Sequence, residues 1–130
     1  MSESHAVLVV EDDRPIRELI VDLLREEGYA VEEAETGAEA LALLDRDRAL
    51  HRFCLILLDV NLPQVDGLAV LRYLADHNLP VPVIAMSASA TQLTNAVAVG
   101  AREVLPKPFG LEQLLTLVAQ NCRHRTRLLS

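Results

Sequence analysis

Short apolar runs and amphipathic segments alternate five times along the chain, and this alternation restricts its fold more than any other feature. The expected strands are residues 6–10, 30–34, 54–58, 81–86 and 103–105, of which 30–34 is a weaker strand with two glutamates. Runs this short, apolar without interruption at 6–10 and 54–58, are typical of strands that are buried on both faces. Strands that alternate with helices predict an α/β domain, a (βα)5 doubly wound, five-stranded parallel sheet with helices on both faces.

The segments between the runs have helical spacing and helix-terminating residues. Asp13 is a plausible cap for the first helix, which Gly28 ends, and Thr36 with Glu39 forms a capping box for a helix to about residue 48. Three more helices are expected from residues 66–67, over residues 91–99 and over residues 111–122. Gly110 is a weak cap for the last of these. The charges within residues 30–34 favour a place near the edge of the sheet.

Length and charge set limits on the function. The chain has 130 residues, which suits one domain, and its net charge of −7 argues against binding of nucleic acid or of an anionic membrane. No run approaches the roughly 18 apolar residues of a membrane span, and the N-terminus does not resemble a secretory signal. We therefore expect a cytoplasmic domain at residues 5–122, and we interpret residues 123–130 as a basic tail or the start of a linker.

The two cysteines, Cys54 and Cys122, lie in an apolar run and at the end of an amphipathic segment. Both are interpreted as buried packing thiols in a reducing compartment. A disulfide is the less favoured alternative, and a metal site is less favoured still, because neither cysteine has a partner at ligand spacing.

Polar side chains follow four of the predicted strands. Glu11 and Asp12 follow the first strand, Asp59 the third and Ser87 the fourth, while Lys107 comes after the fifth. Because sites in such sheets lie at the carboxyl ends of the strands, these groups are expected to converge. The clustered carboxylates would repel each other without a counter-ion, and Mg²⁺ prefers oxygen ligands of this kind.

Each of these residues has a candidate chemical role and a simpler alternative. Asp59 beside Mg²⁺ can attack phosphorus and form an acyl phosphate. The simpler alternative is that this aspartate forms a turn and has no chemical role. Lys107 can pair with a phosphoryl oxygen or be an exposed lysine, and Ser87 can donate its hydroxyl or simply precede a helix. Ala88 is small and leaves the site open. Asp13 is the acidic residue for which capping alone is a serious alternative.

Four segments together resemble the motif set of response-regulator receiver domains. They are LVVEDD at 8–13, LLDVNLP at 57–63 with DG at 66–67, AMSA at 85–88 and KPF at 107–109. The resemblance covers residues 5–122 and implies the flavodoxin-like strand order 2-1-3-4-5. It implies a cis Lys107–Pro108 bond as well.

The resemblance also implies a role for each site residue. Asp59 is the phosphoacceptor, and Ser87 and Lys107 hold the phosphoryl group. Asp12 and Asp59 bind Mg²⁺ directly, together with the backbone carbonyl of Asn61, and Glu11 orients a metal-bound water.

By the same resemblance, the chain is a signalling switch rather than an enzyme with a separate substrate. A sensor histidine kinase or a histidine phosphotransfer protein donates the phosphoryl group, and the altered surface contacts an effector protein, a fused output domain or a second copy in a homodimer. Many receivers carry an aromatic switch residue where this chain has Val104. Asn61 and Ser89 occupy the positions that tune loss of the phosphoryl group.

Three other functions are weighed against this one. A haloacid-dehalogenase-type phosphatase needs an acid two residues after its nucleophile, where this chain has Asn61. A flavodoxin would have phosphate-binding hydroxyls and amides after the first strand instead of three acids. The main alternative is a receiver-like binding module that signals through protein contacts without regulated phosphorylation, which Val104 slightly favours.

Overall fold

The computed structural model describes residues 6–46, 52–62 and 67–122. Five strands alternate with five helices in these residues. In chain order they are β1 (Ala6–Val10), α1 (Arg14–Glu26), β2 (Ala30–Ala34), α2 (Gly37–Arg46), β3 (Phe53–Asp59), α3 (Gly67–Asp76), β4 (Val83–Ser87), α4 (Ala90–Val99), β5 (Glu103–Pro106) and α5 (Leu111–Asn121).

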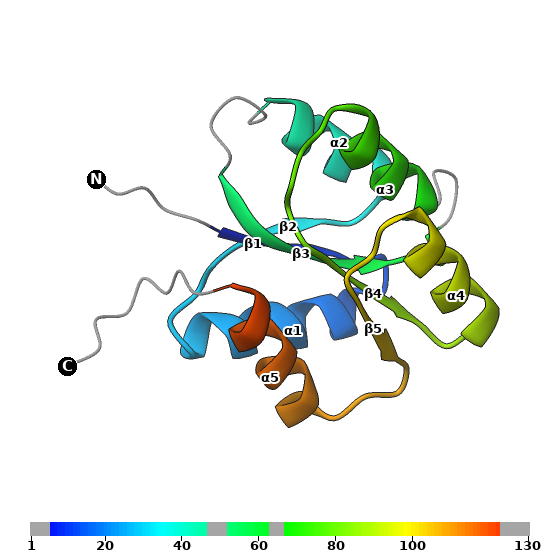
Figure 1. Ribbon diagram of the computed structural model, residues 1–130. Coiled ribbons are helices and arrows are strands. Elements are labelled where there is room, and N and C mark those ends of the chain that lie inside the picture. The colour runs from blue at the N-terminus through cyan, green and yellow to red at the C-terminus, as the bar shows by residue number, and fades with distance from the viewer. Residues whose placement is uncertain (1–5, 47–51, 63–66, 123–130) are drawn as a thin grey trace.

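The strands form one parallel sheet in the order β2-β1-β3-β4-β5. Helices α2, α3 and α4 cover one face of the sheet, and α1 and α5 cover the other (Figure 1). The predicted doubly wound fold and its strand order are therefore confirmed. The charged strand β2 lies at the edge, as its Glu32 and Glu33 indicated.

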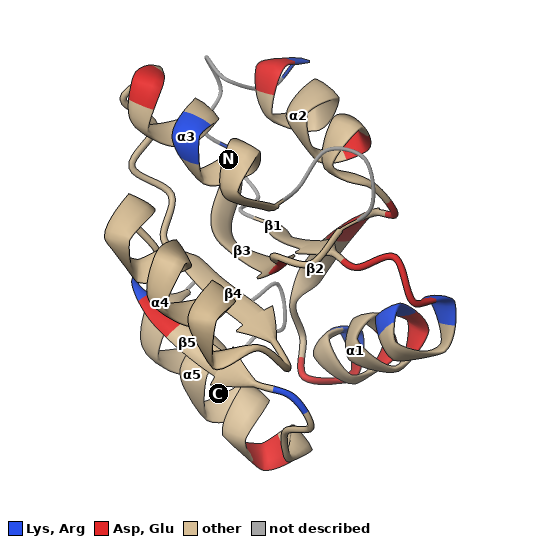
Figure 2. Ribbon diagram, turned by 90° about the vertical axis from the view of Figure 1, so that its right-hand side faces the viewer, with Lys and Arg blue, Asp and Glu red and all other residues tan. Residues whose placement is uncertain are grey.

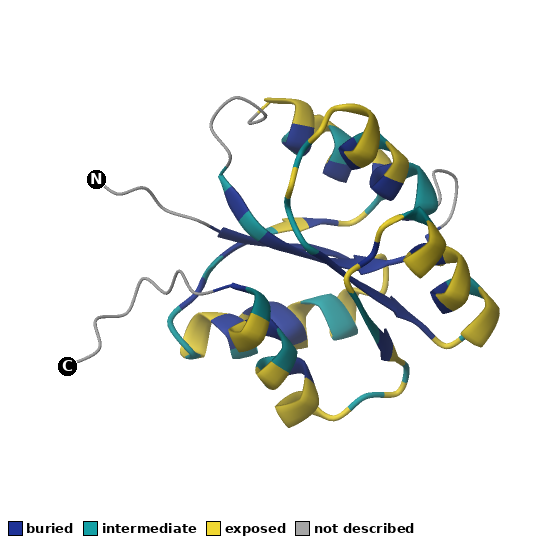
Figure 3. Ribbon diagram, viewed as in Figure 1, coloured by how far each residue is buried: buried dark blue, intermediate teal, exposed yellow. Residues whose placement is uncertain are grey.

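Two apolar layers hold the helices on the sheet. Alternate residues of the strands point to opposite faces, so Leu8 and Val10 pack under α2 and α3 while Val7 and Val9 pack under α1. Figure 3 shows the central strands buried, the edge strands β2 and β5 only partly buried, and the outward sides of the helices exposed. No helix in the described residues is long and apolar enough to cross a membrane.

Most predicted helix ends agree with the structure. The Asp13 carboxylate accepts a hydrogen bond from the Ile16 amide at 3.1 Å, and Gly28 follows α1 with a positive φ of 95°. The Thr36 hydroxyl accepts from the Glu39 amide at 3.0 Å, as in a capping box. Helix α2 ends at Arg46, and the expected extension to residue 48 and the start at residue 66 lie outside the described residues.

The fourth strand begins two residues later than predicted. Residues 81–86 were expected, but β4 comprises Val83–Ser87. Pro82 has no amide hydrogen to donate to a neighbouring strand, although its carbonyl accepts from the Ile56 amide at 3.0 Å. The later end places Ser87 itself at the end of the strand.

The interpretation of the cysteines as separate packing thiols is wrong. Cys54 and Cys122 form a disulfide, with their Cα atoms 5.4 Å apart. A β-bulge explains why the sequence pattern did not predict it: Ala6 pairs with Phe53 and Val7 with Leu55, so Cys54 is the extra residue. Strict alternation would point Cys54 away from Leu55, but the bulge lets both pack on the face that α5 covers.

Candidate functional site at the carboxyl ends of the strands

Four neighbouring strands deliver the predicted polar residues to one edge of the sheet. Glu11 follows β1, Asp59 ends β3, Ser87 ends β4 and Lys107 follows β5. Because β1, β3, β4 and β5 are adjacent and parallel, their carboxyl ends lie side by side. Residues that are far apart in the sequence therefore lie close together at this end of the sheet.

Lys107 bridges two buried carboxylates. Its ammonium nitrogen Nζ lies 2.8 Å from Oε1 of Glu11 and 3.2 Å from Oδ2 of Asp59. Glu11 is fully buried and Asp59 is 4% exposed, so water screens these charges poorly. The cation holds together two carboxylates that would otherwise repel each other.

The burial of Glu11 has an electrostatic consequence. Desolvation, followed by its hydrogen bond to Asp59, raises the pKa of Glu11 to about 7, against a lowering by Lys107. Burial acts to lower the pKa of Lys107, but the hydrogen bond to Glu11 and the charge of Asp59 outweigh it, so that the pKa is raised. Without a further cation, the edge therefore tends to hold an extra proton near neutral pH.

Asp12 completes an acidic cluster with these two carboxylates. One carboxylate oxygen each from Glu11, Asp12 and Asp59 lies within 4.8 Å of the others. Asp12 is exposed, so the cluster opens to solvent on its side. Figure 2 shows the acidic segment that leads from the end of β1 into α1. The donor set is all oxygen with one solvent-facing side, which suits Mg²⁺, an ion that keeps several waters.

Asn61 links the ends of β3 and β4. Its amide nitrogen donates to Oδ1 of Asp59 at 2.8 Å, and its side-chain Nδ2 donates to Oγ of Ser87 at 2.7 Å. The Ser87 oxygen also accepts from the Ser89 amide at 2.9 Å. Both contacts use the Ser87 oxygen as acceptor, which leaves its hydroxyl proton for another partner.

The start of α3 packs closely against the backbone at the end of β3, next to Asp59. A Cβ atom on Gly67, the first residue of α3, would lie 2.8 Å from the Asp59 carbonyl oxygen and 2.5 Å from the Val60 Cα. Only glycine permits α3 to begin this close to the end of β3. The DG pair of the sequence thus contributes its glycine to packing against the site.

The remaining predicted positions lie around the cluster. Ala88 is exposed directly after Ser87. The Ser89 side chain caps α4 by accepting from the Gln92 amide at 3.2 Å. Val104 lies in β5, half-buried against the layer under α4, and the Lys107–Pro108 bond is cis.

Arg17 is a site-supporting residue that the sequence reasoning missed. Its Nη1 donates to the Glu11 backbone carbonyl at 2.8 Å, and its Nε donates to Oε1 of Glu33 at 3.2 Å. Only 11% of its side chain is exposed. A single arginine on a helical face gives no sequence signal that it reaches back to the loop before its own helix.

We expect Arg17→Met to lower the free energy of unfolding by about 1–2 kcal/mol, because the buried Glu11 carbonyl loses its donor. Urea denaturation measures the change. Arg14→Met is the matched control on the same helix, since Arg14 forms an exposed pair with Glu18, and it should leave stability nearly unchanged. Equal effects of the two substitutions would contradict a supporting role for Arg17.

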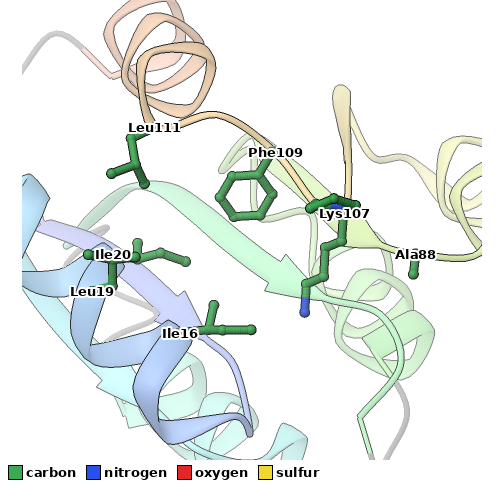
Figure 4. Close-up of a pocket in the computed structure, with 8 residues that line it drawn as sticks. Ile16, Leu19, Ile20, Ala88, Lys107, Phe109 and Leu111 are labelled. Carbon is green, nitrogen blue, oxygen red and sulfur yellow. The ribbon is translucent and has the colours of Figure 1, made fainter.

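An apolar groove lies beside the cluster. It has a volume of about 320 Å³ and runs between α1 and the segment that joins β5 to α5 (Figure 4). The residues that line it are Ile16, Leu19, Ile20, Ala88, Lys107, Pro108, Phe109 and Leu111. Leu19, on the α1 side of the groove, is 52% exposed. The groove therefore places an open apolar surface next to Lys107.

Comparisons with known proteins agree with this arrangement. Residues 7–119 match the model of the response regulator receiver domain family. The response regulator MprA of Mycolicibacterium vanbaalenii is 38% identical over 92% of this chain, and the chain spans 51% of that protein. The chain thus corresponds to about half the length of this relative.

Solved receiver structures have the same fold. The receiver domain of a putative Luxo repressor protein from Vibrio parahaemolyticus has a TM-score of 0.81 and 30% identity, covering 92% of this chain and 90% of that one. The chemotaxis protein CheY4 of Vibrio cholerae has a TM-score of 0.78 and 31% identity, covering 92% and 99%. The chain therefore belongs to the response regulator receiver domain family, the signalling domain of two-component response regulators.

Proposed function

We propose that this receiver domain accepts a phosphoryl group on Asp59 and converts it into a changed binding surface. The observation that carries the proposal is the position of Lys107, whose Nζ lies 3.2 Å from the Asp59 carboxylate and 2.8 Å from that of Glu11. A nearly buried carboxylate beside a fixed cation and an acidic cluster is the arrangement that phosphoryl transfer to aspartate requires.

The acidic cluster fits Mg²⁺ as the cofactor. Asp12 and Asp59 would bind the ion directly with the Asn61 backbone carbonyl, and Glu11 would orient a water on it. When bound, Mg²⁺ supplies positive charge against the phosphoryl oxygens. The Asp59 oxygen Oδ1, which already accepts from the Asn61 amide, is held in one orientation by that bond.

The donor in this proposal is a phosphohistidine of a sensor histidine kinase or of a histidine phosphotransfer protein. An Asp59 carboxylate oxygen attacks phosphorus, the nitrogen–phosphorus bond breaks, and its electron pair returns to the histidine ring. Lys107 keeps its hydrogen-bond donors directed at the place where the phosphoryl oxygens arrive. The domain thus promotes only its own modification and is not an enzyme with a separate substrate.

The switch would start at Ser87. Its hydroxyl proton is available for a phosphoryl oxygen, and turning toward that oxygen alters its contacts with Asn61 and with the Ser89 amide. Ser89 caps α4, so movement of residues 87–89 shifts the start of that helix. Val104 is half-buried and has no aromatic ring that could turn inward. We therefore assign the change to the backbone of residues 87–89.

The shifted surface of α4, β5 and α5 would contact the effector protein, fused output domain or second copy that relays the signal. We place the domain in the cytoplasm, where donors of this kind act, and assign it no membrane or direct nucleic-acid contact. Residues 5–122 would form the receiver unit, with residues 123–130 as its tail or linker. The matched relatives are about twice as long as this chain, so the output is proposed for the whole protein and not for the receiver unit alone.

Intact mass tests the proposal. Incubation with Mg²⁺ and acetyl phosphate should add one phosphoryl group to the wild type and none to Asp59→Asn, whose side chain has no nucleophilic carboxylate. Chelation of Mg²⁺ should prevent the gain. No gain in the wild type would favour the alternative, a binding module without regulated phosphorylation. The observation that favours this alternative is Val104, which stands where many receivers carry an aromatic switch residue.

Magnesium affinity should depend on pH through Glu11. Because its pKa in the metal-free protein is about 7, protons compete with the ion below that pH, and Mg²⁺ should bind about tenfold more weakly at pH 6 than at pH 8. Titration calorimetry at both values measures the ratio. Glu11→Gln should bind more weakly at pH 8 but show a much smaller ratio. An unchanged ratio in this variant would exclude Glu11 as the group responsible.

The groove beside Lys107 is our proposed contact for the phosphohistidine donor. Leu19→Glu should slow phosphorylation by a histidine phosphotransfer protein at least about tenfold, because it places a charge in an apolar contact. Phosphorylation by acetyl phosphate should be unchanged. Val97→Glu on α4 is the matched control, with 53% exposure against 52%, and should affect neither reaction. Equal slowing by both variants would contradict the proposed contact.

A further inference from the structure

The disulfide between Cys54 and Cys122 lies at the opposite end of β3 from the phosphorylation site. Cys54 is the extra residue of the bulge near the start of β3, while Asp59 is the last residue of the same strand. Cys122 is the C-terminal cap of α5 and is 2% exposed. The bond therefore joins the end of the last helix to the middle strand of the sheet.

Helix α5 packs on the sheet through a narrow apolar face, to which Leu115 and Leu117 contribute partly buried side chains. Its two fully buried residues are Leu114 and Val118, one per turn. The capping position before the helix is Gly110, which has no side chain to accept a hydrogen bond. After Val118, the Cys122 amide donates to the Val118 carbonyl at 2.8 Å, and the cysteine side chain is the next buried group. The covalent bond thus adds to the apolar contact that Cys122 makes after the last turn of the helix.

The two cysteines of the pair differ in how far they are buried. Cys54 is only partly buried, whereas Cys122 is covered. Thiol–disulfide exchange needs approach of a thiolate to one sulfur and departure of the other as a thiolate. The geometry favours attack on Cys54 and departure of Cys122, whose release frees the end of α5. The bulge turns the Cys54 side chain toward the face that α5 covers, as bulges commonly redirect side chains.

We propose that Cys54 and Cys122 are a reversible redox site that responds to low-molecular-weight thiols and disulfides and controls whether the end of α5 is fixed to the sheet. An external thiolate attacks Cys54 Sγ, the Cys54–Cys122 bond breaks, and Cys122 leaves with the electron pair and takes up a proton. A second external thiolate then cleaves the mixed disulfide on Cys54. In sum, the protein disulfide and two external thiols give two protein thiols and one external disulfide.

The consequence is local to the last turn of α5. Reduction would leave the last turn of α5 held by noncovalent contacts alone: the packing of Cys122, the hydrogen bond from Asn121 Nδ2 to the Leu117 carbonyl at 2.8 Å, and that from Arg102 Nη1 to Asn121 Oδ1 at 3.4 Å. We expect this turn to open more readily without the covalent bond. The acidic cluster and Lys107 lie at the other edge of the sheet. Phosphorylation by acetyl phosphate should therefore be the same in both redox states, which separates this proposal from that for Asp59.

The test equilibrates the whole chain with glutathione and its disulfide at a series of ratios, without denaturant. Alkylation by a maleimide and intact mass then count the thiols, and hydrogen exchange measures the amides of residues 115–122. We expect two added maleimides after reduction, none after re-oxidation, and exchange in this segment about tenfold or more faster in the reduced protein. Cys54→Ser and Cys122→Ser should each add one maleimide and should match the reduced wild type in the exchange of residues 115–122, with exchange in α1 unchanged in all samples.

Two results would overturn the proposal. The first is a bond that millimolar glutathione does not reduce in the folded protein, which would make it a permanent structural link. The second is equal exchange of residues 115–122 in the oxidised and reduced proteins, which would mean that the bond does not control the end of α5.

Discussion

Lys107→Met should slow the phosphorylation of Asp59 by acetyl phosphate about 10²–10³-fold, the order of magnitude by which loss of one preorganised hydrogen-bond donor slows a reaction whose transition state it stabilises. The lysine lies 3.2 Å from the carboxylate that attacks, so it can stabilise the phosphoryl oxygens without moving. Methionine keeps most of the length and apolar character of the side chain. The rate of mass gain at a fixed Mg²⁺ concentration measures the effect.

The same substitution should change how stability depends on pH. Without Lys107, the buried Glu11 and Asp59 carboxylates face each other with no nearby cation, so the pKa of Glu11 rises above its present value of about 7. A raised folded-state pKa gives a contribution to stability that is present at low pH and lost as pH rises through that pKa. The metal-free variant should therefore be destabilised more at pH 8 than at pH 6.

Lys107→Arg is the control for charge without the same geometry. It should restore most of the stability at pH 8, but only part of the phosphorylation rate, because a planar guanidinium cannot reproduce the lysine contacts with both carboxylates. Phosphorylation of Lys107→Met at the wild-type rate would contradict the role that we assign to this residue.

Loss of the disulfide should lower the free energy of unfolding by about 4 kcal/mol in the chain-entropy model, because the bond joins residues 68 positions apart. A cross-link over a loop this long strongly restricts the unfolded chain. Urea denaturation of the oxidised wild type and of Cys54→Ala/Cys122→Ala measures the difference. The denaturant slope should increase in the variant, since its unfolded chain exposes more surface.

A reducing agent provides the control for this comparison. It should destabilise the wild type by a similar amount and leave the double variant unchanged. Equal stability of the oxidised wild type and the double variant would show that the bond adds nothing to the fold, and would also remove the physical basis for a change at the end of α5.

The overall fold was predictable because its signals are local and repeated. Five short strand-like runs separated by amphipathic segments give the order of elements, and the parallel topology then brings the carboxyl ends of the strands together. Glu11, Asp59, Ser87 and Lys107 could thus be assigned to one edge of the sheet from their positions after the strands. The family model, the relatives and the solved structures agree with this fold and with the receiver family.

What the sequence did not predict depends on single backbone irregularities and long side chains. The bulge at Cys54 changes the side of the sheet on which that residue packs, and no period-two pattern contains it. Pro82 shortened β4 at its start, because a missing amide hydrogen outweighs the apolar character of the run. Arg17 reaches the Glu11 carbonyl only because α1 folds back over the loop that precedes it.

The complete burial of Glu11 is a further feature of the structure that the sequence did not predict. The sequence assigned different roles to the three acids at 11–13, but it gave no sign that Glu11 is fully buried while Asp12 and Asp13 are exposed. The side chain turns under the sheet edge to meet Lys107, which follows it by 96 residues. Such a contact depends on tertiary packing, which also explains why the pKa of Glu11 could not be anticipated.

The most direct test of the account is to identify the residue that carries the phosphoryl group. After reaction with acetyl phosphate and Mg²⁺, borohydride converts a phosphorylated aspartate to homoserine, and peptide sequencing by mass spectrometry locates it. We predict homoserine at position 59 and at no other position. Its absence from position 59 in a protein that has gained the phosphoryl mass would contradict the account.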